Sequence, residues 1–209
     1  MNNPPQVIEK RAYHYWFIDG LGEMTAAVLF ILIGAAFFTQ GTTAPGSLAF
    51  TISGIAGLLL IGGGPWLARP VMAKLKERYT YPVTGYVAYK QPSSKHRVWV
   101  TVLALVVSSV TVSIMMINAE LSMAWLPLIE GVCIAGFLLN IAYQRGIHRF
   151  YPLAGISITA GAGLAVTGYG DLAGTGIYFL MIGATVLFSG ACTFAAYRKN
   201  HPAAMDAEE

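Results

Sequence analysis

The chain has few charged residues. Only 11% of its 209 residues are Asp, Glu, Lys or Arg, whereas an average soluble domain carries about 25%. So few charges could not cover the surface of a water-soluble fold of this size. A surface that faces lipid does not need to be covered with charged residues. With 56% apolar residues, the composition predicts an integral membrane protein.

Residues typical of catalytic and metal sites are also scarce. The two cysteines, Cys133 and Cys192, lie within apolar runs, and the four histidines have no metal-ligand spacing. The glycine run 62–64 precedes Pro65 and lacks the Lys-Ser/Thr of a phosphate loop. No Ser-His-Asp arrangement is evident. We therefore predict no enzymatic activity, no metal and no cofactor.

Six apolar runs are long enough to cross a bilayer, whose core of about 30 Å needs about 20 helical residues. Each run is apolar on all faces and lacks the alternation of a barrel strand. We predict an all-α membrane protein, a six-transmembrane-helix bundle that forms a single domain over residues 1–209. The predicted spans are 17–38, 47–67, 98–117, 123–143, 150–168 and 174–197, and a loop at 69–97 lies outside the membrane.

The positive charges give this bundle an orientation. All 13 Lys and Arg residues fall in the N-terminal segment, the loop after the second span, the loop after the fourth span or the C-terminal segment. In a six-span arrangement these four segments share one side, and Lys and Arg are retained in the cytoplasm. We predict a protein of the cytoplasmic (plasma) membrane with both termini in the cytoplasm. The basic residues then reflect topology, and no nucleic acid partner is expected.

The loop after the second span is the one sizeable segment predicted outside the membrane. Residues 71–78 favour a short amphipathic helix on the membrane surface, and residues 79–89 favour a small β-hairpin around a Pro-x-x-Gly turn. Its basic and aromatic side chains are candidates for binding anionic headgroups or a cytoplasmic partner. The alternative is that the loop is rigid and binds nothing, and that its basic residues only reflect the retention of positive charge in the cytoplasm. The candidates are Lys74, Lys76, Arg78, Tyr79, Tyr81, Tyr86 and Tyr89.

A ten-residue string in the same loop is similar to one found in other proteins. Residues 78–87 read Arg-x-Thr-Tyr-Pro-x-Thr-Gly-Tyr-Val, which resembles a string in a family of uncharacterised bacterial multi-pass membrane proteins. Members often have Arg after the Pro, where this chain has Val83. The paired, Gly-rich hairpins also loosely resemble the layout of the acid-resistance (HdeD-like) membrane family. The resemblance implies a six-span layout and no particular activity.

Small residues mark predicted contacts between helices, because close approach in lipid relies on them. The second span offers Ser53 and Gly57, and the fifth offers Ser157 and Gly161, each pair one turn apart. The sequences around the two pairs align without gaps. The first and fourth spans also match over Ile-Asp/Glu-Gly. These matches would fit an inverted repeat of three plus three helices, or they reflect chance similarity among apolar, Gly-rich helices.

Acidic residues within spans are costly and often functional. Asp19 and Glu23 share one face of the first span, and Asn140 lies on the same stripe of the fourth span as Glu130. Desolvation favours the protonated form of a carboxyl, so these side chains form a candidate polar path for protons, joined by hydroxyls of the third span.

A structural role is the alternative for each acid. Glu130 would be protonated, or hydrogen-bonded to Asn140 or a hydroxyl. Asp19 would cap the first helix or pair with Lys10 or Arg11. The sequence therefore supports two hypotheses. The first is a non-enzymatic membrane scaffold or accessory protein, which binds lipid and packs with itself as a homo-oligomer or with a membrane protein partner. The second is a small proton-coupled transporter or channel.

Overall fold

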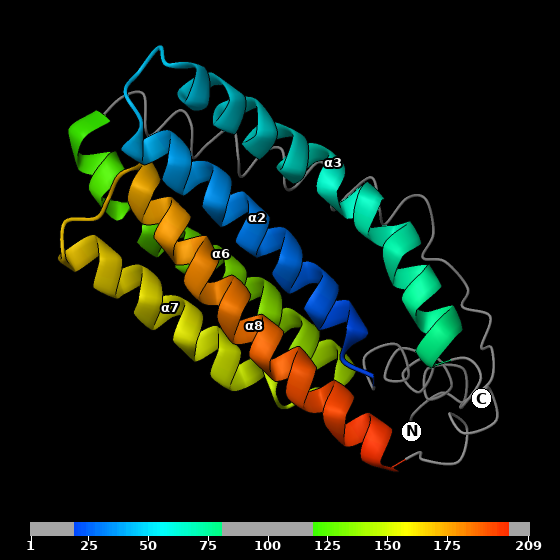
Figure 1. The fold of residues 1–209 in the computed structure, drawn as a ribbon. Coiled ribbons are helices and arrows are strands. Elements are labelled where there is room, and N and C mark those ends of the chain that lie inside the picture. Colours follow the sequence, from blue (N-terminus) through cyan, green and yellow to red (C-terminus); the bar gives the residue numbers. More distant parts are fainter. Residues whose placement is uncertain (1–18, 81–118, 201–209) are drawn as a thin grey trace, which may run out of the picture.

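The computed structural model describes residues 19–80 and 119–200. Within these two ranges the chain folds into five helices and no strand, and the helices lie side by side (Figure 1). The helices are α2 (Leu21–Thr42), α3 (Leu48–Tyr79), α6 (Ala119–Arg145), α7 (Phe150–Val166) and α8 (Leu172–Asn200). The third predicted span, 98–117, lies outside the described residues.

Several of these helices suit a membrane. In the described part of the chain, three helices are long and apolar enough to cross one, Leu21–Thr42, Trp125–Gln144 and Leu172–Asn200. The bent α3 makes a fourth when its two halves are taken as one span, and α7 is a shorter apolar helix. An all-helical membrane protein agrees with the prediction, while the count of six spans and the sidedness stay predictions.

Large apolar side chains cover the outside of the bundle. Leu58, Trp66 and Phe188 are each more than 70% exposed, and the two cysteines are exposed and free. In water such a surface would aggregate, because soluble proteins seldom expose large contiguous apolar patches. The same surface is what a helix presents to lipid.

Helix α2 begins four residues later than the predicted first span. Gly20 adopts a left-handed conformation, with φ of +68°, which ends helical geometry on its N-terminal side. Asp19 Oδ1 accepts a hydrogen bond from the backbone N–H of Leu21 at 3.1 Å. Together these two residues fix the start of the helix.

Helix α3 joins two elements that the sequence analysis separates. The predicted second span, 47–67, and the predicted surface helix, 71–78, form one helix that bends by 57° between Gly64 and Trp66. Pro65 lies at the bend, and proline removes a helical hydrogen bond and kinks the chain. Tyr79 ends this helix and Thr80 is its C-cap, so the hairpin predicted from residue 79 does not include that tyrosine. The rest of it, residues 81–89, lies outside the described ranges.

Helices α2 and α8 form the closest contact of the bundle, and they run antiparallel. A side chain placed on Gly183 would put its Cβ 2.7 Å from Ile31 Cγ1, and one on Gly34 would lie 2.8 Å from the backbone nitrogen of Leu180. The two backbones therefore meet with almost no side chain between them. We call this contact the glycine seam. Its residues recur every seven positions: Gly20, Ala27, Gly34 and Gly41 on α2, and Gly176, Gly183 and Gly190 on α8.

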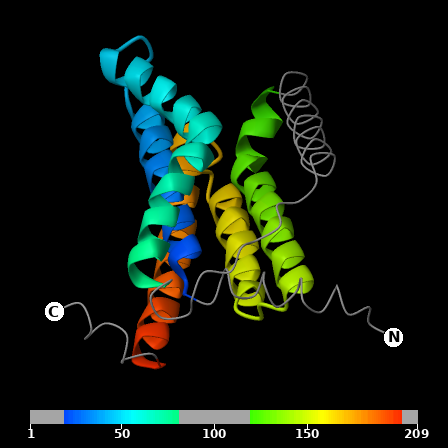
Figure 2. The same ribbon diagram turned by 90° about the vertical axis from the view of Figure 1, so that its right-hand side faces the viewer.

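A second close contact joins α6 to α7. A Cβ on Gly131 would lie 2.8 Å from the carbonyl oxygen of Ser157, and one on Gly161 would lie 3.1 Å from Leu128 Cα. Figure 2 shows the resulting arrangement, in which α2, α3 and α8 form one group of helices and α6 with α7 form another. Contacts of α8 with α6 and α7 connect the two groups.

Candidate functional site

Asp19 lies in a fully buried polar cluster between the start of α2 and the end of α3. Its Oδ2 atom is 3.1 Å from Lys76 Nζ, and their side chains are 0% and 2% exposed. The Thr80 hydroxyl donates to the same oxygen at 2.8 Å, while the other oxygen caps α2. Every part of this carboxylate therefore has a partner. The cluster fixes the end of α3 against α2.

This cluster corrects the prediction for Lys76. The sequence analysis places Lys76 among loop residues that bind headgroups or a partner, but the structure buries it against Asp19. Lys74 and Arg78 are exposed on the same helix, and Tyr79 is partly buried. The other three predicted loop residues, Tyr81, Tyr86 and Tyr89, lie outside the described ranges.

Glu23 joins three elements one turn further into α2. Arg149, in the turn before α7, donates from Nε to Glu23 Oε1 at 2.9 Å, and its Nη2 contacts the same oxygen. Ser189 of α8 donates to Glu23 Oε2 at 3.2 Å. The glutamate side chain is 3% exposed and the arginine side chain 31%. This ion pair connects the two groups of helices at the end where α2 begins.

Of the three acids predicted within spans, Glu130 is the one that forms no ion pair in the described part of the chain. It lies on α6, and the hydroxyl of Thr175 on α8 is close to its carboxyl group. Glu130 Oε2 and Thr175 Oγ1 are nevertheless buried atoms that have no hydrogen bond within residues 19–80 and 119–200. The hydrogen bond suggested between Glu130 and Asn140 does not form. Asn140 is exposed, and its side-chain oxygen accepts a hydrogen bond from Gln144 at 2.8 Å.

A third polar contact lies at the centre of the bundle. The Ser157 hydroxyl donates to the carbonyl of Gly131 at 2.9 Å and, with its one hydrogen so used, accepts from the Tyr178 hydroxyl at 2.7 Å. Both side chains are fully buried. Ser157 thus contacts α6 and α8 from α7. Of the other predicted packing residues, Ser53 and Gly57 lie on the buried face of α3, and Gly57 faces Ala36 and Phe37 of α2.

Within residues 19–80 and 119–200, the three acids are not joined into one path. Asp19 and Glu23 are each bound to a different basic residue, and Glu130 lies on the other group of helices. The hydroxyls predicted to connect them belong to the third span, outside the described residues. No three His, Cys, Asp or Glu side chains in the described part of the chain are placed to hold a metal ion.

The sequence analysis missed the glycine seam and the basic partners of Asp19 and Glu23. A recurrence of glycine or alanine every seven residues in the first and last spans would have pointed to the seam, because seven residues are close to two helical turns. The ion pairs could have been expected from the predicted topology. Acids near one end of the first span share that end with every basic residue of the predicted layout.

The helices, their apolar exterior and their few buried polar contacts define an all-helical, membrane-embedded class of protein. The chain matches no protein-family model, no curated protein and no solved structure. The resemblance of residues 78–87 to a string in multi-pass membrane proteins therefore stays a prediction.

Proposed function

We propose that the chain is a non-enzymatic integral membrane protein that acts as a scaffold or an accessory subunit. The observation that carries this proposal is the pairing of the two acids at the start of α2, Asp19 just before the helix and Glu23 in its first turn. Asp19 binds Lys76 of α3, and Glu23 binds Arg149 before α7. An acid already neutralised by a fixed basic side chain holds helices together and is poorly placed to carry a mobile proton.

The proposal includes six spans in a cytoplasmic membrane with both termini inside. Support comes from the described basic residues, which lie in the second half of α3, at the end of α6, in the turn before α7 and in the last turn of α8. These segments meet at the end of the bundle where α2 begins (Figure 1). Such a gathering is what retention of positive charge in the cytoplasm produces.

Replacing Glu23 with Gln tests the structural role of this pair. Hydrogen bonds to charged groups contribute about 1.5–3 kcal/mol. Because Arg149 is partly solvated, we expect a loss of about 1–2 kcal/mol in the free energy of unfolding, which thermal unfolding in detergent measures. Combining Glu23→Gln with Arg149→Met should cost less than the sum of the two single changes. Glu77→Gln, at an exposed position of α3, is the matched control and should have almost no effect.

The scaffold proposal also predicts the absence of flux. Vesicles reconstituted with the parent protein should dissipate a proton gradient no faster than vesicles without protein, as read by a pH-sensitive dye. Faster dissipation by the parent protein would count against a purely structural role.

A second candidate function, a small proton-coupled transporter or channel, rests on Glu130. Its buried Oε2 atom has no hydrogen bond among the described residues, and neither has the hydroxyl of Thr175 facing it from another helix. Buried polar atoms are normally hydrogen-bonded. Two such atoms without a hydrogen bond, facing each other from α6 and α8, mark a place where a proton or a polar solute could bind.

Replacing Glu130 with Gln separates the two functions. The scaffold proposal predicts no flux in the parent protein and unchanged or lower stability in the variant, since Gln keeps the shape and removes the acid. The transport proposal predicts flux in the parent, its loss in Glu130→Gln, and retention of the thermal unfolding midpoint. Glu77→Gln should leave both flux and stability unchanged.

A further inference from the structure

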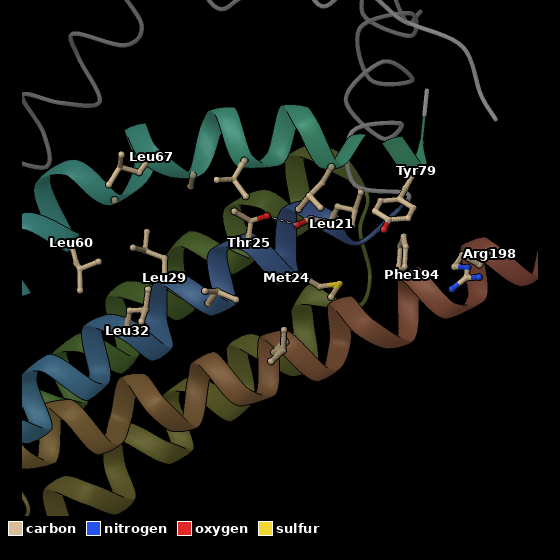
Figure 3. A pocket seen from close by; sticks show the side chains of 16 residues that line it. Leu21, Met24, Thr25, Leu29, Leu32, Leu60, Leu67, Tyr79, Phe194 and Arg198 are labelled. Carbon is tan, nitrogen blue, oxygen red and sulfur yellow. Dashed lines mark hydrogen bonds between the residues drawn. The ribbon is translucent and has the colours of Figure 1, made fainter. Parts of the chain in front are cut away.

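The bend of α3 leaves a groove beside α2 and α8. The α2 and α3 helices meet at Gly64, where a Cβ would contact the side chain of Leu29. Beyond this point α3 turns by 57°, and a groove of about 500 Å³ opens between the three helices (Figure 3). Its volume falls within the range of about 300–1,000 Å³ typical of ligand pockets.

One end of the groove is purely apolar. Leu29, Leu32, Leu60 and Leu67 gather there from α2 and α3 (Figure 3). The apolar lining continues along the groove with further aliphatic side chains, and Thr25, one of its few polar members, donates its hydroxyl hydrogen to the carbonyl oxygen of Leu21 at 2.8 Å. A bound group in this part of the groove would meet almost no free hydrogen-bonding atom.

The other end of the groove is aromatic and positively charged. Tyr79 of α3 and Phe194 of α8 meet edge to face with their ring centroids 5.8 Å apart. Arg198 lines the groove one turn beyond Phe194, and the Arg78 guanidinium lies 5.6 Å from the centroid of the Tyr79 ring. Neither arginine forms an ion pair with an acid of the described ranges. Arg198 and Tyr79 therefore line this end of the groove, and Arg78 lies beside Tyr79 outside the lining.

The length of the groove matches one leaflet of a bilayer. Along α8 it extends from Leu187 to Arg198, and along α2 from Leu21 to Leu32, which in each case is 11 steps from the first residue to the last. At about 1.5 Å per residue this is about 16 Å, close to half of the roughly 30 Å hydrocarbon core. A chain entering at the charged end would finish near the middle of the membrane.

We propose that this groove binds an anionic phospholipid, with one acyl chain along the leucines and the phosphate at Arg198, while Arg78 adds positive charge from beside Tyr79. An apolar channel one leaflet long with basic residues and a tyrosine at its end has the chemistry of such a lipid.

Removing the charge at the mouth of the groove tests the headgroup contact. Protein purified from vesicles of equal parts phosphatidylglycerol and phosphatidylcholine is examined by native mass spectrometry for bound lipid. The parent protein should retain phosphatidylglycerol preferentially. Arg198→Gln should reduce that preference about fivefold, which corresponds to about 1 kcal/mol for one basic residue near an anionic surface. Lys199→Gln, one residue on and outside the groove lining, is the matched control and should keep the preference.

Filling the groove tests the acyl chain contact. Ala68 lines the groove, whereas Ala73 is an exposed residue of the same helix that does not. Ala68→Trp should lower retention of both lipids, and Ala73→Trp should retain the parent level. Ala68→Leu, a smaller change, should have an intermediate effect and covers the case in which the tryptophan variant does not fold, which size-exclusion chromatography and thermal unfolding would reveal.

Three results would overturn the proposal. The first is equal lipid retention by Ala68→Leu, Ala68→Trp and the parent. The second is an equal effect of Arg198→Gln and Lys199→Gln. The third is a change of oligomeric state in Ala68→Trp without a change in bound lipid, which would assign the groove to a second copy of the chain.

Discussion

Asp19→Asn should destabilise the protein by about 3–5 kcal/mol, the usual cost of removing one partner of a buried ion pair. Asparagine keeps the side-chain oxygen that accepts from the Leu21 N–H, so the cap of α2 survives. What disappears is the negative charge that balances the Lys76 ammonium, 3.1 Å away and only 2% exposed. Thermal unfolding in detergent measures the loss.

The controls for this variant use a second capping aspartate. Asp171 accepts from the Gly174 N–H at 2.8 Å, and it is exposed. Asp171→Asn should therefore change stability by less than about 0.5 kcal/mol. Adding Lys76→Met to Asp19→Asn should recover much of the loss, because both buried charges are then gone. Equal unfolding midpoints for the Asp19 and Asp171 variants would refute the buried pair.

The second large effect is expected in the glycine seam. Gly176→Ala places a Cβ 2.6 Å from Phe38 Cα, a backbone atom that can move only if the two helices separate. Overpacking of a close contact costs about 1–3 kcal/mol, and a contact with backbone should reach about 3 kcal/mol. The midpoint of thermal unfolding should fall accordingly.

A matched glycine on α7 isolates the packing effect. Gly163 is exposed, and a Cβ there would meet nothing within 4 Å. Gly163→Ala should raise stability by up to about 1 kcal/mol through helix propensity alone. If Gly176→Ala and Gly163→Ala shift the midpoint in the same direction, α2 and α8 do not meet as closely as described.

The helices were the most predictable part of the structure. A run of about 20 apolar residues has few ways to satisfy its backbone in lipid other than a helix. The predicted fourth, fifth and sixth spans begin within four residues of α6, α7 and α8. The start of α2 was less predictable, because it depends on a left-handed Gly20. The continuity of α3 was missed, since proline in a sequence indicates a break as readily as a bend.

The site was predictable in its acids and unpredictable in its contacts. The cost of a charge in lipid singles out Asp19, Glu23 and Glu130 from sequence alone. The partner of Glu23 is 126 residues away along the chain, and only the packing of helices brings Arg149 to it. Asn140 was placed with Glu130 by helical periodicity, but ten residues along a helix separate them by about 15 Å.

The packing of the small-residue pairs is similar in the two halves of the predicted internal repeat. The small pair of the second span, Ser53 and Gly57, lies on the buried face of α3, and Gly57 faces α2. The equivalent pair, Ser157 and Gly161, faces α6 from α7. In both cases the second helix of a hairpin uses its small residues against the first. The full repeat stays a prediction, because it also requires the span at 98–117.

The glycine seam has a consequence for how the chain is assembled during synthesis. The helix that α2 fits most closely, α8, is the last of the described helices to leave the ribosome, more than 100 residues later. Until α8 is made, the glycine face of α2 has no helix packed against it. Glu23 also lacks its hydrogen bond from Ser189. The contact between α2 and α8 can therefore form only after α8 has been synthesised, and a chain truncated before α8 should be degraded by membrane proteases faster than one that includes it.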